Sequence, residues 1–198
     1  MFTYYLGVFL MYMDETDSFW LMSRVLSQPR YWRLSQLYLD GFPLLHRFEY
    51  MMAKFIKKLY PRFYKHLKTL ACSDDGLCAD PANAVNMILT TFLPQWFQHM
   101  FGLFQPPIVM RMWDLFLLEG PKVLFRVALG MIRLFKRRMK KMEFGDLIIF
   151  LRGEIYHENI DVNDFYNMIY AHVNITTVQM NKYSDQFKDL RRLGAVQF

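Results

Sequence analysis

Residues 94–135, PQWFQHMFGLFQPPIVMRMWDLFLLEGPKVLFRVALGMIRLF, decide the fold. Their large apolar side chains recur at steps of three and four residues, which predicts three helices in close succession. The first is expected over residues 94–101. Pro106 suits the first turn of the second, which ends at Gly120, and Pro121 can begin the third. Because almost no linker separates them, these helices must pack on one another and on the preceding segment.

The composition indicates a well-packed domain, or one large fragment of a domain. Of the 198 residues, 54% are hydrophobic and 18% aromatic, which supplies ample core and gives no case for disorder. No segment alternates convincingly with a period of two, so an all-α fold is predicted. Further helices are expected over residues 2–13, 18–27, 43–59, 61–67, 84–92, 143–151, 161–170 and 177–193.

The helix expected over residues 18–27 follows an acidic turn. Asp17 precedes it and has a side chain that can cap its first turn. The spacing predicts that Phe19, Trp20 and Met22 point inward.

Residues 1–13 form a largely apolar run without a charged side chain. This run is shorter than the roughly 20 residues that a membrane-spanning helix needs. It also lacks the basic n-region and the small-residue cleavage site of a secretion signal. A buried helix is therefore predicted, and the chain is expected to be soluble and cytoplasmic.

The cysteines and histidines predict no metal site and no cofactor. Five residues separate Cys72 from Cys78, which is not the C-x-x-C spacing of a zinc or redox site. Free thiols in a polar loop over residues 71–83 are expected, and a disulfide is the alternative in an oxidising compartment. The histidines are scattered. No nucleophile or orienting carboxylate lies near His66 in sequence, so a packed or capping role is expected for that residue.

Positive charge is concentrated between Glu119 and Glu143, where every charged residue is basic. Four of these basic residues fall on one helical face: Arg126, Arg133, Arg137 and Lys140. One interpretation is a solvated face whose cations complement the helix dipole. The other is attraction to an acidic membrane surface or an acidic partner. Nucleic acid is not expected, because the aromatic residues belong to apolar stripes and do not interleave with this basic group.

A set of motifs runs through the chain in a fixed order. An acidic F-W segment is followed by L-x-P-R-x-x-K-H-L, then W-F-x-x-x-F, R-x-W-D and E-G-x-x-V-L-F-R-x-A-L. These motifs resemble the C-terminal half of a TBC domain, the module of Rab GTPase-activating proteins. The residues that carry the resemblance, all expected to be structural, are Asp17, Phe19, Trp20, Pro61, His66, Trp96, Phe97, Arg111, Trp113, Asp114 and Gly120.

The resemblance implies a chemistry whose catalytic residues are missing from this sequence. TBC domains are understood to supply two catalytic side chains, called fingers, to a Rab protein during GTP hydrolysis. One is an arginine from I-x-x-D-x-x-R and the other is a glutamine from Y-x-Q. Neither motif occurs in residues 1–198. The resemblance therefore predicts the C-terminal half of a TBC domain over residues 1–152, with a loop insertion near 71–83 and a helical extension over 153–198. No catalytic residue and no cofactor are expected.

Three functions fit these observations. The first is a Rab GTPase-activating protein that lacks its N-terminal half, which is not an enzyme itself and is inactive as it stands. The second is a noncatalytic TBC-like protein that binds a Rab-type small GTPase. The third is a helical adaptor that uses the basic face on a membrane, so a peripheral position on endomembranes is an option. If the chain is a GTPase-activating protein that lacks its N-terminal half, a large apolar surface should be exposed.

Overall fold

The chain folds into an array of helices, described by a computed structural model for residues 3–73 and 84–193. No strand occurs within these two ranges, so the all-α prediction is confirmed. The helices are α1 (Thr3–Leu10), α2 (Glu15–Ser27), α3 (Pro43–Leu59), α4 (Pro61–Ser73), α5 (Ala84–Gln98), α6 (Pro106–Glu119), α7 (Lys122–Met139), α8 (Phe144–Arg152), α9 (Val162–His172) and α10 (Thr177–Arg192). Short 3-10 turns add η1 (Pro29–Tyr31), η2 (Leu34–Leu37) and η3 (Glu154–His157).

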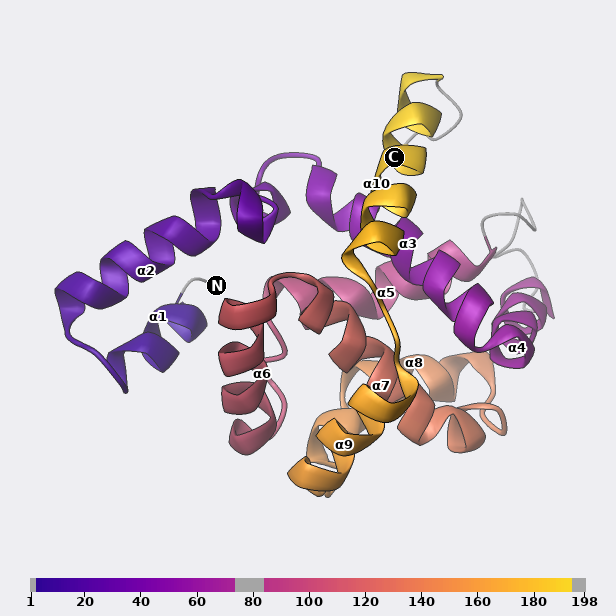
Figure 1. The fold of residues 1–198 in the computed structure, drawn as a ribbon. Coiled ribbons are helices and arrows are strands. Elements are labelled where there is room, and N and C mark those ends of the chain that lie inside the picture. Colours follow the sequence, from indigo (N-terminus) through magenta and orange to yellow (C-terminus); the bar gives the residue numbers. More distant parts are fainter. Residues whose placement is uncertain (1–2, 74–83, 194–198) are drawn as a thin grey trace.

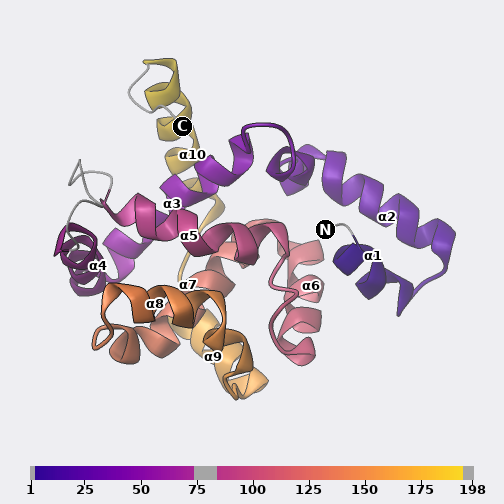
Figure 2. The same ribbon diagram turned by 180° about the vertical axis from the view of Figure 1, so that it is seen from behind.

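Helices α3, α5 and α7 form the centre of the array (Figure 1). The α1–α2 hairpin stands at one end of the molecule beside α6, as both opposite views show (Figure 2). Helix α10 crosses α3, whereas α8 packs on α5 and α9 packs on α7. Segments far apart in the sequence therefore share one core.

Three phenylalanine rings join the central helices. Phe48 of α3 lies 5.2 Å from Phe97 of α5 and 5.0 Å from Phe125 of α7, measured between ring centroids. The rings of Phe97 and Phe125 are 5.3 Å apart, so each ring contacts the other two. All three side chains are fully buried. We call this group the phenylalanine triad.

The central stretch matches the prediction in its last two helices and differs in its first. Helix α6 begins at Pro106, and Gly120 caps its end with a φ of 78°. The helix expected over residues 94–101 is instead the end of α5, which continues through Pro94. A continuous buried face, from Ile88 to Phe97, keeps α5 in one piece despite the proline.

The start of α2 also differs from the prediction. Asp14 is the N-cap, and its side chain accepts a hydrogen bond from the backbone N–H of Asp17 at 2.8 Å. Asp17, predicted to be the cap, lies within the first turn. Its carboxylate there still complements the helix dipole. The prediction failed because two acidic residues stand three positions apart at this helix start.

The structure also bears on the N-terminal helix and on the loop predicted near residues 71–83. Of the residues 1–13 predicted to form a buried helix, α1 covers Thr3–Leu10, and Phe9 is buried whereas Met11 is exposed. No helix in the described part of the chain is long and apolar enough to cross a membrane. Helix α4 continues to Ser73, and the rest of the predicted 71–83 insertion lies outside the described residues.

A close approach between α7 and α9 gives the first testable prediction. A Cβ on Gly130 would lie 2.6 Å from Cγ1 and 2.9 Å from Cδ1 of Ile169. We expect Gly130→Val to lower the free energy of unfolding by about 1–3 kcal/mol, because overpacking forces the two helices apart. Urea denaturation measures the change.

The matched control is Gly145→Val on α8, where a Cβ would meet nothing within 4 Å. This variant should change the free energy of unfolding by less than about 0.5 kcal/mol. Equal losses in the two variants would show that helix propensity, and not the α7–α9 contact, sets the cost.

Candidate functional site

The R-x-W-D segment of α6 connects that helix to two others. Trp113 is buried, with its ring 5.0 Å from Phe9 of α1 and 5.5 Å from Phe116, both edge-on. Arg111 donates to Oδ1 of Asn163 at 2.8 Å. Asp114 is exposed and makes no hydrogen bond or ion pair in the described structure.

The guanidinium of Arg111 also lies 5.2 Å above the ring of Tyr166 on α9. The Tyr166 hydroxyl donates to the carbonyl of Ile108 at 2.8 Å, which closes the α6–α9 contact. Burial raises the pKa of Tyr166. Arg111 is therefore held within the fold by an amide oxygen and an aromatic face.

A corner at Glu119 and Gly120 joins α6, α7 and α9. The Glu119 carboxylate accepts from Lys122 and Arg126, both at 2.8 Å, and from the Tyr170 hydroxyl at 2.9 Å. Burial alone would raise the pKa of Glu119. The hydrogen bonds from Lys122 and Tyr170 and the nearby positive charge outweigh burial, so the pKa lies below its ordinary value.

Gly120 lies against the η1 turn at this corner. A Cβ there would lie 3.5 Å from the backbone oxygen of Arg30, and the φ of 78° already disfavours any other residue. The Arg30 guanidinium donates to the carbonyl of Leu118 at 2.9 Å, and the Tyr31 hydroxyl to that of Leu117 at 3.2 Å. Side chains from η1 thus satisfy carbonyls that the end of α6 leaves open.

The other family-motif residues fall into two groups. Trp96 and Phe97 are fully buried, and the Trp96 indole N–H donates to the carbonyl of Leu151 on α8 at 3.3 Å. Pro61 is the exposed first residue of α4. His66 is half-buried on α4, with its ring 6.5 Å from that of Phe63, and its Nε2 has no hydrogen-bond partner.

Phe19 and Trp20 do not point inward, so that prediction is wrong. Their exposed fractions are 62% and 59%, and the inward face of α2 carries Ser18, Met22 and Val25 instead. The spacing of these three residues, four and then three positions, is itself helical and could have identified the buried face.

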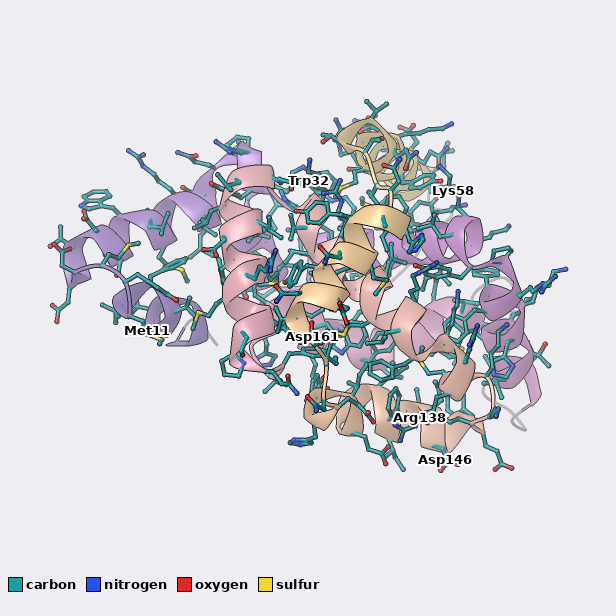
Figure 3. The ribbon with its side chains drawn as sticks, turned by 60° about the horizontal axis from the view of Figure 1, so that its bottom comes forward. Met11, Trp32, Lys58, Arg138, Asp146 and Asp161 are labelled. Atoms are coloured by element: carbon teal, nitrogen blue, oxygen red, sulfur yellow. The ribbon has the colours of Figure 1, made fainter. Side chains whose placement is uncertain are left out.

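Large exposed apolar side chains also lie at the end of α1 and in the turn that follows it. The resulting hairpin patch consists of Leu10, Met11, Tyr12, Phe19 and Trp20. Met11 marks its position at one end of the molecule in Figure 3. Clustered exposed side chains of this size are typical of a surface that contacts another protein. The sequence interpretation missed this surface because it assigned Phe19 and Trp20 to the core.

The predicted basic face is divided in the structure. Arg126 belongs to the Glu119 corner, where it also donates to the carbonyl of Ile175 at 3.3 Å. Arg137 and Lys140 are exposed near the end of α7, and Arg133 is half-buried there. Burial and the positive charges of Arg133, Lys140 and Arg137 lower the pKa of Lys136.

The neighbouring residue Arg138 is not available to an external anion. It pairs with Glu154 at 3.2 Å and with Glu158, on the side of the molecule away from the hairpin patch (Figure 3). The basic group that remains free to attract an anion is therefore smaller than the sequence indicated. We call Arg133, Lys136, Arg137 and Lys140 the α7 basic end.

No metal or catalytic centre is evident among residues 3–73 and 84–193. The side chains there form no group of three or more potential metal ligands. The motif residues connect helices, and none of them combines a nucleophile with a base. The motif residues therefore form a helical scaffold.

The comparisons with known proteins identify the scaffold. The family model of the Rab-GTPase-TBC domain matches residues 2–140, so the chain belongs to this family. Helices α8, α9 and α10 follow the matched region.

Three curated relatives agree with this assignment. The chain is 33% identical to mouse Carabin over 135 residues, which is 65% of this chain and 25% of Carabin. It is 24% identical to the yeast (Saccharomyces cerevisiae) GTPase-activating protein GYP5 over 145 residues, 73% of this chain and 14% of that protein. It is 28% identical to mouse TBC1 domain family member 10B over 135 residues, which is 64% of this chain and 14% of that protein. The chain thus spans at most a quarter of each relative.

The Glu119 corner gives a prediction about pH. We expect Glu119→Gln to lower the free energy of unfolding by about 1 kcal/mol at neutral pH, because Lys122 and Arg126 lose their counter-charge. The folded-state pKa of Glu119 is below 4.5. The difference should therefore be complete above pH 4.5 and vanish as the pH falls through the lowered pKa.

Thermal and urea unfolding between pH 3 and 7 measure this difference. Asp114→Asn, on the exposed side of the same helix, is the control and should change stability by less than about 0.5 kcal/mol. A Glu119→Gln effect that stays constant down to acid pH would exclude a charge-based role for the corner.

Proposed function

We propose that this chain is the C-terminal scaffold of a Rab GTPase-activating TBC domain, and that residues 1–198 alone do not accelerate GTP hydrolysis. One observation carries the proposal: the structural motifs of the family are present in order, whereas I-x-x-D-x-x-R and Y-x-Q are both missing. The family match and the similarity to the GTPase-activating protein GYP5 support the class of activity. The partner is then a Rab-type small GTPase, which supplies its own GTP and Mg²⁺.

The physical argument concerns the arginine. Phosphoryl transfer is accelerated mainly by positioning and by charge, so the arginine must reach the transferred phosphate from outside the GTPase. Arg111, the arginine of the R-x-W-D motif, is bonded to Asn163 and stacked on Tyr166. Freeing it would break the α6–α9 contact, which makes it unsuitable as a finger.

The hairpin patch supports the same proposal. A half-domain that carries the two fingers would need an apolar surface to pack on, and the exposed rings of Phe19 and Trp20 offer one. Asp14, Glu15 and Asp17 border these rings and would help to align a basic partner surface. In this arrangement the chain positions the fingers without contributing either one.

Single-turnover GTP hydrolysis on a panel of Rab proteins tests the proposal. The chain alone should leave every rate unchanged. A chimaera that places the motif-bearing segment of another TBC domain ahead of residue 2 should raise the rate of at least one Rab by about 10³-fold or more. The control is the same chimaera with the arginine of its I-x-x-D-x-x-R motif replaced by alanine. Stimulation by the 198-residue chain alone would contradict the proposal.

A second candidate function is a noncatalytic adaptor that binds a Rab protein or an acidic membrane surface. The observation in its favour is the α7 basic end, where burial and then the neighbouring positive charges lower the pKa of Lys136. Such a group attracts anionic lipid by about 1 kcal/mol for each basic residue near the surface. A peripheral position on endomembranes would follow from this attraction.

Sedimentation with vesicles that contain anionic lipid tests the adaptor function. Replacing Arg137 and Lys140 by glutamate should weaken binding by about tenfold or more. The control replaces Lys65 and Lys68, exposed on α4, in the same way and should bind like the native chain. Equal weakening in both variants would indicate attraction by net charge, with no role for the α7 basic end.

A further inference from the structure

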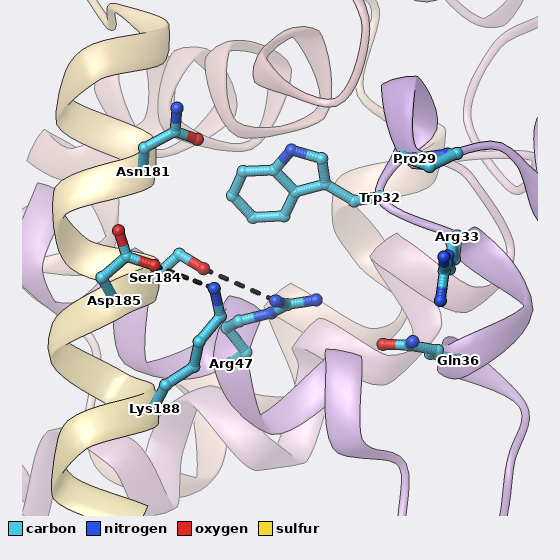
Figure 4. A pocket seen from close by; sticks show the side chains of 9 residues that line it. All are labelled: Pro29, Trp32, Arg33, Gln36, Arg47, Asn181, Ser184, Asp185 and Lys188. Atoms are coloured by element: carbon cyan, nitrogen blue, oxygen red, sulfur yellow. Dashed lines mark hydrogen bonds and ion pairs between the residues drawn. The ribbon is translucent and has the colours of Figure 1, made fainter.

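A cavity lies between the η1–η2 segment and α10, apart from the motif residues. Its volume is roughly 450 Å³, and it is open to solvent on one side. One wall consists of Trp32, Arg33, Gln36 and Arg47, and the other of Asn181, Ser184, Asp185 and Lys188, with Pro29 at the edge (Figure 4). The second wall belongs to α10, which lies outside the region matched by the family.

The charges of the lining favour an anion. Three cationic side chains and one anionic side chain leave a net charge of +2. Lys188 pairs with Asp185 at 2.8 Å, whereas Arg33 makes no hydrogen bond or ion pair within the described structure. A group with a charge near −2 would match this balance, and a phosphate monoester carries about −1.5 to −2 at neutral pH.

Arg47 is the most informative side chain of the cavity. Its Nη1 donates to the Ser184 hydroxyl at a long 3.5 Å, and its Nε is buried without a partner. Burial lowers the pKa of this guanidinium, and the charge of Asp185 only partly offsets the effect. A half-buried cation with an unsatisfied N–H group is costly to the fold, and an anion in the cavity would accept a hydrogen bond from it.

The remaining side chains suit a small polar molecule. The guanidinium of Arg47 lies 5.1 Å from the centre of the Trp32 ring, which Phe48 contacts at 6.0 Å. Gln36, Asn181 and Ser184 bring amide and hydroxyl groups that both donate and accept. Trp32 and Arg33 both have positive φ, 58° and 51°. This left-handed backbone conformation is unfavourable for residues other than glycine, and it is frequent at ligand-binding sites.

From these observations we propose that the cavity between η1–η2 and α10 binds a phosphate monoester carried by a small polyol. Arg33 and Arg47 hold the phosphate, Trp32 packs against the carbon skeleton, and the amides bind hydroxyl groups. The same group occurs on a soluble sugar or glycerol phosphate and on a lipid headgroup. This site is independent of the scaffold function proposed above, because it uses none of the motif residues.

Calorimetric titration of the whole chain with glycerol 3-phosphate tests the soluble form of the ligand. We expect saturable binding that Arg33→Gln weakens by about tenfold or more, because a charge-assisted hydrogen bond is lost. Lys182→Gln, on α10 but outside the cavity lining, should bind like the native chain. Asp185→Asn should tighten binding, since it removes a repulsive charge and releases Lys188.

Binding to lipid vesicles tests whether the ligand is a lipid headgroup. Phosphatidic acid carries the same glycerol phosphate monoester, and phosphatidylglycerol at matched surface charge is the control. Preference for phosphatidic acid that Arg33→Gln abolishes would support the site with a lipid as its source. Absence of binding to both glycerol 3-phosphate and phosphatidic acid, or binding that Arg33→Gln and Asp185→Asn leave unchanged, would overturn the proposal. Arg33 and Asp185 are both exposed, so these two variants should remain folded and their binding can be measured.

Discussion

The contact of Phe48, Phe97 and Phe125 is the constraint on which the rest of the structure depends. Each ring comes from a different central helix, and the ring centroids are 5.0–5.3 Å apart. Aromatic pairs at these distances favour particular orientations and contribute about 0.5–1.5 kcal/mol beyond their burial. The triad therefore fixes α3, α5 and α7 relative to one another. The peripheral helices then attach to a centre whose geometry is already set.

The family motifs of this chain act as connections between helices. Trp113 joins α6 to α1, Arg111 joins α6 to α9, and Trp96 joins α5 to α8. Each connection uses one large side chain that reaches a partner on another helix. This explains how the sequence can keep the family pattern while it carries neither finger. The pattern in residues 94–126 specifies a fold, and a fold alone does not specify a chemistry.

The sequence predicted where helices begin and end better than it predicted which side of each helix is buried. Prolines and glycines marked the helix ends near Pro106 and Gly120, because their backbone preferences are local. Phe19 and Trp20 were misassigned because two helical faces of α2 are both apolar, and only contacts with α1, η1 and η2 decide which one is buried. The cavity could not be predicted at all. Arg33, Arg47 and Lys188 meet only because α10 crosses α3, which no local pattern encodes.

Helix α10 links the cavity to the phenylalanine triad. Phe187 contacts Tyr50 at 5.5 Å and Tyr183 contacts Phe55 at 5.0 Å, so α10 rests on α3 through aromatic rings. Phe55 in turn lies 5.8 Å from Phe125 of the triad. A ligand held between Arg47 on α3 and the α10 wall would favour the state in which these contacts are made, since it binds only when α10 is in place. Occupancy of the cavity would then stabilise the attachment of a helix outside the matched region to the centre of the domain.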